Sequence, residues 1–129
     1  MKPQRRKHAR RSVRVPVLCR IRNRKNEIVI SAVGKTNNIS LGGMNVSLPV
    51  HLLKLNSRLV EYTAELPEPF APLAGKGVIR WGYWDEKNWQ TTFGLELCWL
   101  EDDQIAELED FLRHLNEQSE TPFFSTMNN

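Results

Sequence analysis

Long apolar runs and a network of cysteines are missing from this 129-residue sequence. No stretch approaches the roughly 18–20 apolar residues that a membrane-spanning helix needs. No apolar segment follows the basic N-terminus, as a secretory signal would require. The two cysteines, Cys19 and Cys98, are too few for a disulfide framework and lack metal-ligand spacing. We therefore expect a cytoplasmic protein with reduced thiols and no membrane span.

Clusters of side chains that could hold a metal or drive catalysis are also missing. His8, His51 and His114 lie far apart in the sequence, without the spacing of metal ligands. The acidic run that begins at Glu101 is typical of the start of a helix, where negative charge is favoured. No serine, cysteine or carboxylate pattern matches a catalytic triad or dyad. We expect that the protein is not an enzyme and needs no cofactor.

Acidic residues are absent from the beginning of the chain. The first 25 residues hold eleven of the 18 Lys and Arg residues, and the first acid is Glu27. Residues 101–120 hold eight of the 15 acids, so the net charge of +3 conceals a basic N-terminal arm and an acidic C-terminal segment. Residues 1–9 have almost no apolar content and are expected to be flexible. Such an arm binds an anionic partner or is a solvated tail.

Alternating apolar residues predict that most of the chain forms β-strands. Over residues 13–21, valines, Cys19 and an isoleucine occupy every second position, as in a strand with one buried face. Further on, Ile79, Trp81 and Tyr83 share one face of another strand by the same rule. The expected strands span residues 13–22, 27–33, 44–48, 58–66, 75–84 and 89–99, with turns at 24–26 and 85–88, a proline-rich loop at 66–72 and a connection at 50–57 that has room for a helical turn.

The apolar period changes near residue 102. Ile105, Leu108, Phe111, Leu112 and Leu115 fall on one face of a helix that is expected to run from about Asp102 to Gln118. About six short strands without crossover helices, followed by one helix, predict a mainly β fold, namely a six-stranded antiparallel β-barrel with a C-terminal α-helix packed on it. The expected organisation is a flexible arm at 1–9, one domain at 10–118 and a flexible tail at 119–129.

Two segments carry chemistry that suits an anionic nucleotide. Arg10 and Arg14 stand where the arm meets the first strand, and a guanidinium fork pairs with phosphate oxygens or with O6 and N7 of guanine. The segment from Asn38 to Gly43 has short polar side chains and two glycines, which are typical of a turn whose backbone N–H groups face an anion. Taken separately, the arm also fits a solvated tail, and the second segment fits a plain β-turn.

Together, the two segments resemble the paired motifs of the PilZ domain family. The matching residues are Arg10 and Arg14 in an Arg-x-x-x-Arg motif, and Asn38, Ser40 and Gly43 in an Asn-x-Ser-x-x-Gly motif. The family form of the second motif begins with Asp or Asn, so this sequence fits it. The strand order and the terminal helix are similar too. The resemblance covers most of the chain and implies a PilZ-like split barrel that binds the bacterial second messenger cyclic di-GMP.

The resemblance also implies a role for each motif residue. Arg10 and Arg14 would hold guanine edges and phosphates of the ligand. Asn38 and Ser40 would add polar contacts to base and phosphate, and Gly43 would let the ligand lie close to the backbone. These five residues form the core of the site that we expect.

Two further residues are candidates for the same site. Arg11 alternates away from the motif arginines and is expected to add positive potential. Trp81 lies near the point where many similar proteins place an apolar or aromatic residue against the ligand, so its indole could stack on guanine. Ordinary barrel core is the alternative for Trp81. The other three tryptophans are expected to be packing residues: Trp84, Trp89 and Trp99.

The function implied by the resemblance is a receptor that acts as a switch. Ligand bound through Arg10 and Arg14 would order the arm over the barrel, and the new surface would bind or release a protein partner. One alternative is a PilZ-type adaptor that has lost nucleotide binding. Another is a basic nucleic-acid-binding module, which gives no reason for the second motif. Ala9 stands where similar proteins with an intercalated ligand dimer tend to have arginine. Whether one or two ligands bind therefore remains open.

Overall fold

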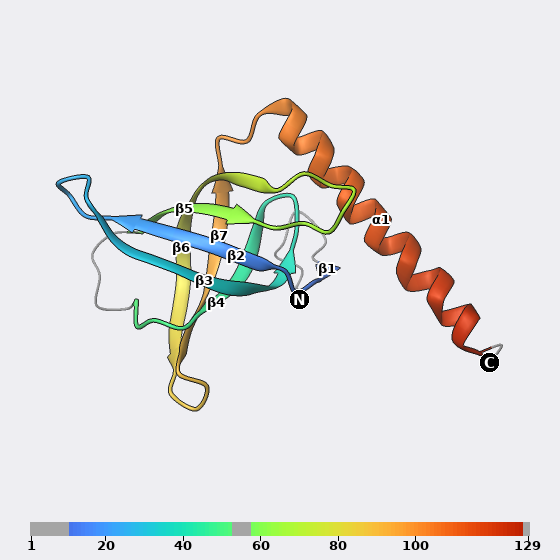
Figure 1. Ribbon diagram of the computed structural model, residues 1–129, viewed down its shortest axis with the longest axis horizontal. Coiled ribbons are helices and arrows are strands. Elements are labelled where there is room, and N and C mark those ends of the chain that lie inside the picture. The colour runs from blue at the N-terminus through green and yellow to red at the C-terminus, as the bar shows by residue number, and fades with distance from the viewer. Residues whose placement is uncertain (1–10, 53–57, 128–129) are drawn as a thin grey trace, which may run out of the picture.

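Seven strands and one helix make up the computed structural model, which describes residues 11–52 and 58–127, with side chains in the helix described to residue 117 (Figure 1). The expected flexible arm, the first motif arginine Arg10 and most of the 50–57 connection lie outside the described residues. The elements are β1 (Arg11–Ser12), β2 (Pro16–Arg22), β3 (Ile28–Ile39), β4 (Gly43–Leu48), β5 (Leu59–Ala64), β6 (Leu73–Asp85), β7 (Gln90–Cys98) and α1 (Asp102–Met127).

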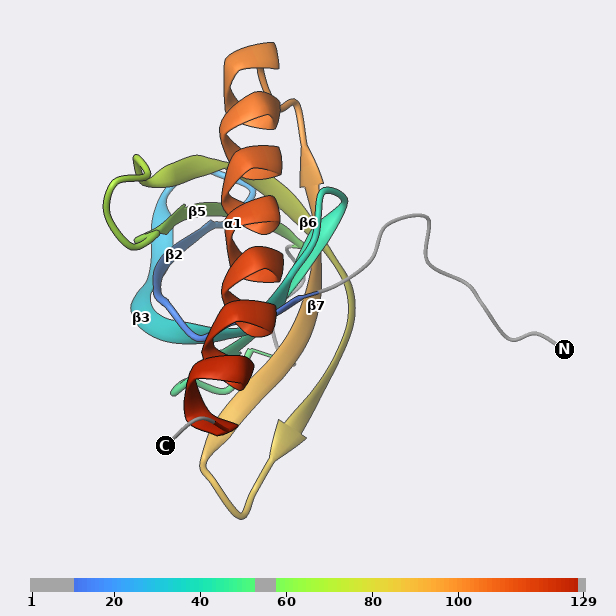
Figure 2. The same ribbon diagram turned by 90° about the vertical axis from the view of Figure 1, so that its right-hand side faces the viewer.

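The strands form one antiparallel sheet that closes on itself. Their order is β1-β3-β2-β5-β6-β7-β4, and an additional pairing between β3 and β4 completes the barrel. Six strands, β2 to β7, therefore make the closed barrel, while β1 is an outside strand paired with β3. Figure 2 looks toward one end of this barrel, with α1 lying across it. The predicted six-stranded antiparallel barrel with a C-terminal helix is confirmed.

The core fills the barrel from alternating positions of its strands. On β2, Val17, Cys19 and Ile21 are fully buried, as the period of two predicted. The helix adds two fully buried side chains, Leu108 and Phe111, so its apolar face packs against the barrel as expected. This core fixes the barrel wall, whose outer face carries the residues of the candidate site.

Two elements extend six or more residues beyond their predicted ends. β3 continues six residues past the expected end at residue 33, because polar residues on the outer face of a strand do not interrupt its ladder of hydrogen bonds. Asn38 therefore lies in a strand and not in the turn. α1 extends to Met127 rather than ending at Gln118, so residues 119–127 continue the helix. The sequence has no glycine or proline between Leu115 and Pro122 to end the helix, although its apolar period ends there.

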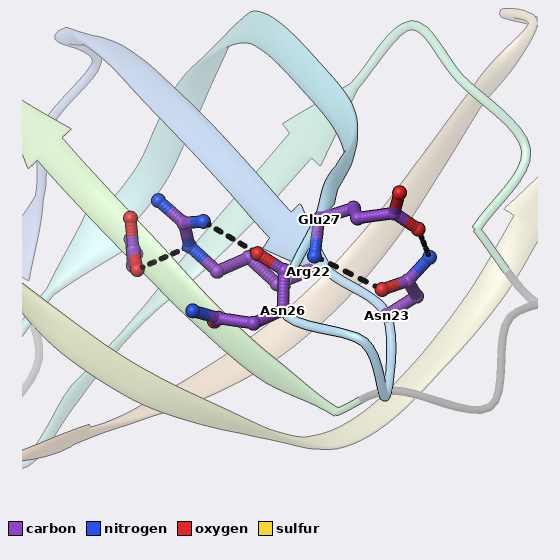
Figure 3. A network of polar contacts seen from close by, with 5 residues as sticks. Arg22, Asn23, Asn26 and Glu27 are labelled. Carbon is purple, nitrogen blue, oxygen red and sulfur yellow. Dashed lines mark hydrogen bonds and ion pairs between the residues drawn. The ribbon is translucent and has the colours of Figure 1, made fainter.

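The hairpin between β2 and β3 lies at the end of the barrel opposite to α1 (Figure 1). Figure 3 shows the polar contacts that shape its turn. Asn23 Oδ1 accepts hydrogen bonds from the backbone N–H groups of Lys25, at 2.9 Å, and Glu27, at 3.0 Å. Arg22 Nε donates to Glu61 Oε2 of β5 at 3.0 Å, which ties the hairpin to the barrel. The basic residues of this turn are thus distant from the second motif.

Candidate functional site

The segment that follows the basic arm joins the barrel beside the second motif. β1 pairs with the last residues of β3, with Arg11 opposite Ile39 and Ser12 opposite Asn38. Arg11 is half-buried. The pairing brings together two segments that are more than twenty residues apart in the sequence, the chain around the arginines and the start of the Asn-x-Ser-x-x-Gly motif.

The backbone around Arg14 is fixed by one buried threonine. Thr36 Oγ1 accepts a hydrogen bond from the backbone N–H of Val15 at 3.0 Å and donates one to the carbonyl of Val13 at 2.7 Å. The N–H of Thr36 donates to the carbonyl of Val15, also at 3.0 Å. Thr36 has no exposed surface, whereas Arg14, between its two partners, is exposed. The guanidinium of Arg14 is therefore carried into solvent from a rigidly held backbone.

The turn between β3 and β4 is closed by the serine of the second motif. Ser40 Oγ accepts hydrogen bonds from the N–H groups of Gly42 and Gly43, each at 3.2 Å, and its own N–H donates to the carbonyl of Gly43 at 2.8 Å. Ser40 is only 3% exposed. The N–H groups that we expected to face an anion are engaged by this hydroxyl, so Ser40 shapes the turn from within.

Close packing between strands explains the glycine of the second motif. A Cβ built on Gly43 would lie 2.5 Å from the carbonyl oxygen of Leu95 on β7, a distance that real Cβ atoms do not adopt. None of the described glycines has a positive φ, so the turn does not use the left-handed conformation that Gly42 and Gly43 permit. The space around Gly43 is needed by the backbone of β7.

Trp81 lies on the outer wall of the barrel. A β-bulge between Ile79 and Trp81 shifts the register of β6 against β7, so Ile79 packs against the core while Trp81 is 44% exposed. The prediction that Ile79, Trp81 and Tyr83 share a face is therefore wrong for Ile79, and barrel core is excluded for Trp81. The rings of Trp81 and Tyr83 are nearly parallel, with centroids 6.4 Å apart. The rings of Trp81 and Tyr83 thus lie exposed on the outer wall, where a flat ligand group could stack on them.

The remaining tryptophans differ in their exposure. Trp84 is half-buried and stacks on His51, with ring centroids 4.3 Å apart, and Trp89 meets its edge at 5.1 Å. Trp89 and Trp99 are each 72% exposed. The expected packing role is seen for Trp89 in its contact with Trp84, whereas Trp99 lies largely at the surface. Each of the two directly adjoins an end of β7 in the left-handed region, with φ of 54°.

The register of the sheet places the second motif and Trp81 in one row on the outer wall. Ser12 pairs with Asn38, Asn38 with Asn45, Asn45 with Gly94, and Gly94 with Trp81. A Cβ on Gly94 would lie 2.2 Å from Trp81 Nε1, so the indole covers this glycine. The ring therefore extends across β7 toward β4 and the second motif.

Two asparagines in this region were missed by the sequence reasoning. Asn37 occupies the irregular position between Thr36 and Asn38 in the pairing of β3 with β4. Its Nδ2 donates to Asn45 Oδ1 at 2.8 Å and to Ser47 Oγ at 3.1 Å. The alternation of β4 is a signal that could have identified Asn45, since Met44 and Val46 on either side of it are fully buried. Nothing in the sequence alone indicates the bulge at Asn37.

Charge on the wall is partly compensated by an ion pair. The guanidinium of Arg80, the bulged residue of β6, contacts the carboxylate of Glu96 on β7. Inside the barrel, burial raises the pKa of the Cys19 thiol to about 12. Burial, with a smaller contribution from Cys98, raises the pKa of Tyr62 to about 12. Both interior groups are therefore neutral near pH 7, and Cys19 is the core thiol that we expected.

Within residues 11–52 and 58–127, no group of three or more His, Cys, Asp or Glu side chains is arranged to hold a metal ion. In the same part of the chain, no helix combines the length and apolar character that a membrane crossing requires.

Comparison with protein families matches residues 4–114 to the PilZ domain. Among curated proteins, no significant match is found. Among solved structures, the inhibitor of motility MotI/DgrA from Bacillus subtilis is 25% identical with a TM-score of 0.64, and the match covers 89% of this chain and 53% of that one.

Two more distant structures share the fold. The PilZ domain of YcgR from Escherichia coli, solved with c-di-GMP, is 16% identical with a TM-score of 0.63, and 92% of this chain matches 97% of that domain. The MrkH–c-di-GMP complex from K. pneumoniae is 17% identical with a TM-score of 0.69, and 92% of this chain matches 54% of that one. The chain thus spans about half the length of MotI and MrkH and nearly all of the YcgR domain.

Proposed function

The chain belongs to the PilZ domain family, and on that premise we propose that it is a receptor for cyclic di-GMP, with its site on the outer barrel wall beside β1. Two relatives in the same fold were solved with this nucleotide. The family assignment supports a binding domain rather than an enzyme, acting in the cytoplasm of a bacterium.

One observation carries the proposal, namely the pairing of Ser12 with Asn38. It brings the arginine-bearing segment and the second motif to one place, so a single small ligand can contact both. Cyclic di-GMP has two phosphates and two guanines, and arginine forks suit both groups. We propose that Arg10 and Arg14 bind them directly and that Arg11 adds positive potential.

The second motif and Trp81 complete the proposed site. Asn38 offers its side chain at the end of β3, while Ser40 and Gly43 contribute mainly by holding the turn in shape. The exposed face of Trp81 suits a guanine ring, and stacking of a base on an aromatic side chain contributes about 1–3 kcal/mol.

The proposed consequence of binding is a switch. Ligand held by Arg10 and Arg14 would fix the N-terminal arm against the barrel, and the surface so formed would bind or release a protein partner. Comparing hydrogen exchange of the amides of residues 1–14 with and without ligand tests this step. Equal exchange in both states would contradict the switch while leaving ligand binding intact.

Isothermal titration with cyclic di-GMP tests the receptor function. We expect binding by the wild type and about 5- to 150-fold weaker binding by Arg14→Ala and by Arg10→Ala, because a bidentate arginine contact contributes about 1–3 kcal/mol. Arg24→Ala is the matched control. It removes the same charge from the hairpin at the other end of β3, roughly 30 Å away along the strand.

The outcomes of this titration are decisive for the proposal. No heat of binding at tens of micromolar ligand would refute the receptor function. Equal affinities of Arg14→Ala, Arg24→Ala and wild type would show that the nucleotide binds elsewhere.

A further inference from the structure

Asn45 lies on the outer wall between the second motif and the aromatic face of Trp81. It pairs with Asn38 on one side and with Gly94 on the other. Since Gly94 has no side chain and is covered by the Trp81 indole, this ring reaches toward Asn45 from the neighbouring strand. An aromatic face and a half-buried amide therefore stand side by side, as is needed to stack a base and to contact its edge.

The amide of Asn45 is held in one orientation by Asn37. Asn37 Nδ2 uses its two hydrogens in bonds to Asn45 Oδ1, at 2.8 Å, and to Ser47 Oγ, at 3.1 Å. Ser47 Oγ is in turn bonded to Thr92 Oγ1 of β7 at 2.9 Å, and Ser47 and Thr92 are 7% and 6% exposed. The chain of bonds is thus anchored in nearly buried side chains. With Oδ1 turned to Asn37, the Nδ2 group of Asn45 is turned away from it.

This orientation distinguishes between the two purines. On its Hoogsteen edge, guanine offers acceptors only, N7 and O6, whereas adenine offers N7 beside the N6 amino donor. A freely rotating asparagine reads adenine with both its oxygen and its nitrogen. An asparagine whose oxygen is engaged presents its donors, and these suit guanine.

Resting on the proposed function, we propose that Asn45 is a specificity-determining contact that favours guanine over adenine, with Asn37 as its positioning residue. Neither residue belongs to the two motifs. Their role differs from that of the arginines, which also hold the phosphates common to both dinucleotides. The measurable quantity is therefore the ratio of the dissociation constants for cyclic di-AMP and cyclic di-GMP, two ligands of equal charge.

Titration of both dinucleotides into the wild type and three variants tests this role. For Asn45→Ala, we expect about tenfold weaker binding of cyclic di-GMP and a smaller effect on cyclic di-AMP, since one hydrogen-bonding donor group is lost. Asn45→Asp keeps the shape but presents acceptors, so its ratio should fall further toward the adenine ligand. Asn37→Ala should lower the ratio while cyclic di-GMP still binds, because the Asn45 amide is free to turn.

Asn88→Ala in the β6–β7 turn is the matched control and should leave both affinities unchanged. If the wild type does not bind cyclic di-GMP, the proposed function fails. If the wild type binds and Arg14→Ala weakens it, but the ratio is the same in all Asn45 and Asn37 variants, only the present inference is overturned. Asn45→Asp is nearly isosteric, so it provides the ratio even if the alanine variant at this position fails to fold.

Discussion

Two buried hydroxyl groups give the candidate site its shape. Thr36 Oγ1 bonds to the backbone on both sides of Arg14, and Ser40 Oγ bonds to two N–H groups of the turn that follows β3. Both side chains are at most 3% exposed. Their bonds go to backbone groups that would otherwise lack partners, so their contribution is to position the residues that face solvent.

Thr36→Val should separate these contributions. Valine has nearly the same shape but leaves the buried N–H of Val15 without its acceptor, at a cost of about 1–3 kcal/mol in the free energy of unfolding. Urea denaturation of the ligand-free protein measures this loss. Titration with cyclic di-GMP should also show weaker binding, because the backbone that carries Arg14 is released.

Thr36→Ser is the matched control, since it keeps the hydroxyl and loses only a methyl group. We expect it to bind cyclic di-GMP as the wild type does. A valine variant as stable as the serine variant, with unchanged affinity, would show that the hydroxyl has no part in holding Arg14.

The motif glycine illustrates what a sequence can and cannot indicate about one residue. The sequence suggested only that some group, which we expected to be a ligand, lies close to the backbone of Gly43. It could not indicate which group approaches, and the carbonyl of Leu95 is the one that does. That neighbour comes from a strand about fifty residues away, so it is defined only when the barrel closes.

At the scale of the elements, the positions of the strands could be predicted from the sequence. Which face of each strand is buried could be predicted only in part. The alternation on β2 was right because its core residues pair in regular register, from Val17 to Ile21. On β6 the bulge at Arg80 reverses the faces beyond it, which moves Trp81 to the outer wall. A bulge depends on the pairing of two strands, so the pattern of a single strand does not reveal it.

The packing of α1 yields a prediction at the same scale. Phe111 is fully buried, with its ring in edge contact with Phe70 at a centroid distance of 5.3 Å. Phe111→Ala should lower the free energy of unfolding by about 3–5 kcal/mol, because a large cavity is left between helix and barrel. Chemical denaturation followed by circular dichroism measures the change.

Ile105→Ala provides the comparison on the same helix face. Ile105 is 36% exposed, so its truncation should cost less than about 1.5 kcal/mol. Equal losses for the two variants would contradict the view that the helix is held mainly through its middle.

At the scale of the whole molecule, the sequence resemblance supplied what the local patterns could not. Short alternating strands predicted a β fold, but closure depends on the pairing of β3 with β4. The candidate site, too, could be predicted from the sequence only in part. The motif residues could be identified in the sequence, whereas the row from Ser12 to Trp81 exists only through the register of five strands.

The buried interior predicts how stability depends on pH. The pKa values of Cys19 and Tyr62 are raised to about 12 in the folded protein, so the native state keeps protons that the unfolded chain loses above about pH 9 at Cys19 and about pH 10 at Tyr62. The stability that each group contributes is fully present below its own onset. It should fall at higher pH by up to about 1.4 kcal/mol per pH unit for each group.

Urea denaturation at intervals from pH 7 to pH 11 measures this dependence. Cys19→Ala should show a shallower decline above pH 9 than the wild type, although its stability at pH 7 is lower. A flat profile in the wild type over this range would contradict the burial of both groups in the native state.

The pairing of β1 with β3 also affects how fast the proposed ligand would dissociate. Because β1 pairs with β3 at the site, Arg11 is held beside the second motif, where it would meet a nucleotide bound there at a high effective concentration. A nucleotide that lost its contact with one side chain would then be rebound by that side chain before it left the site. In such an arrangement, a low dissociation constant would come mainly from slow dissociation of the nucleotide rather than from fast association.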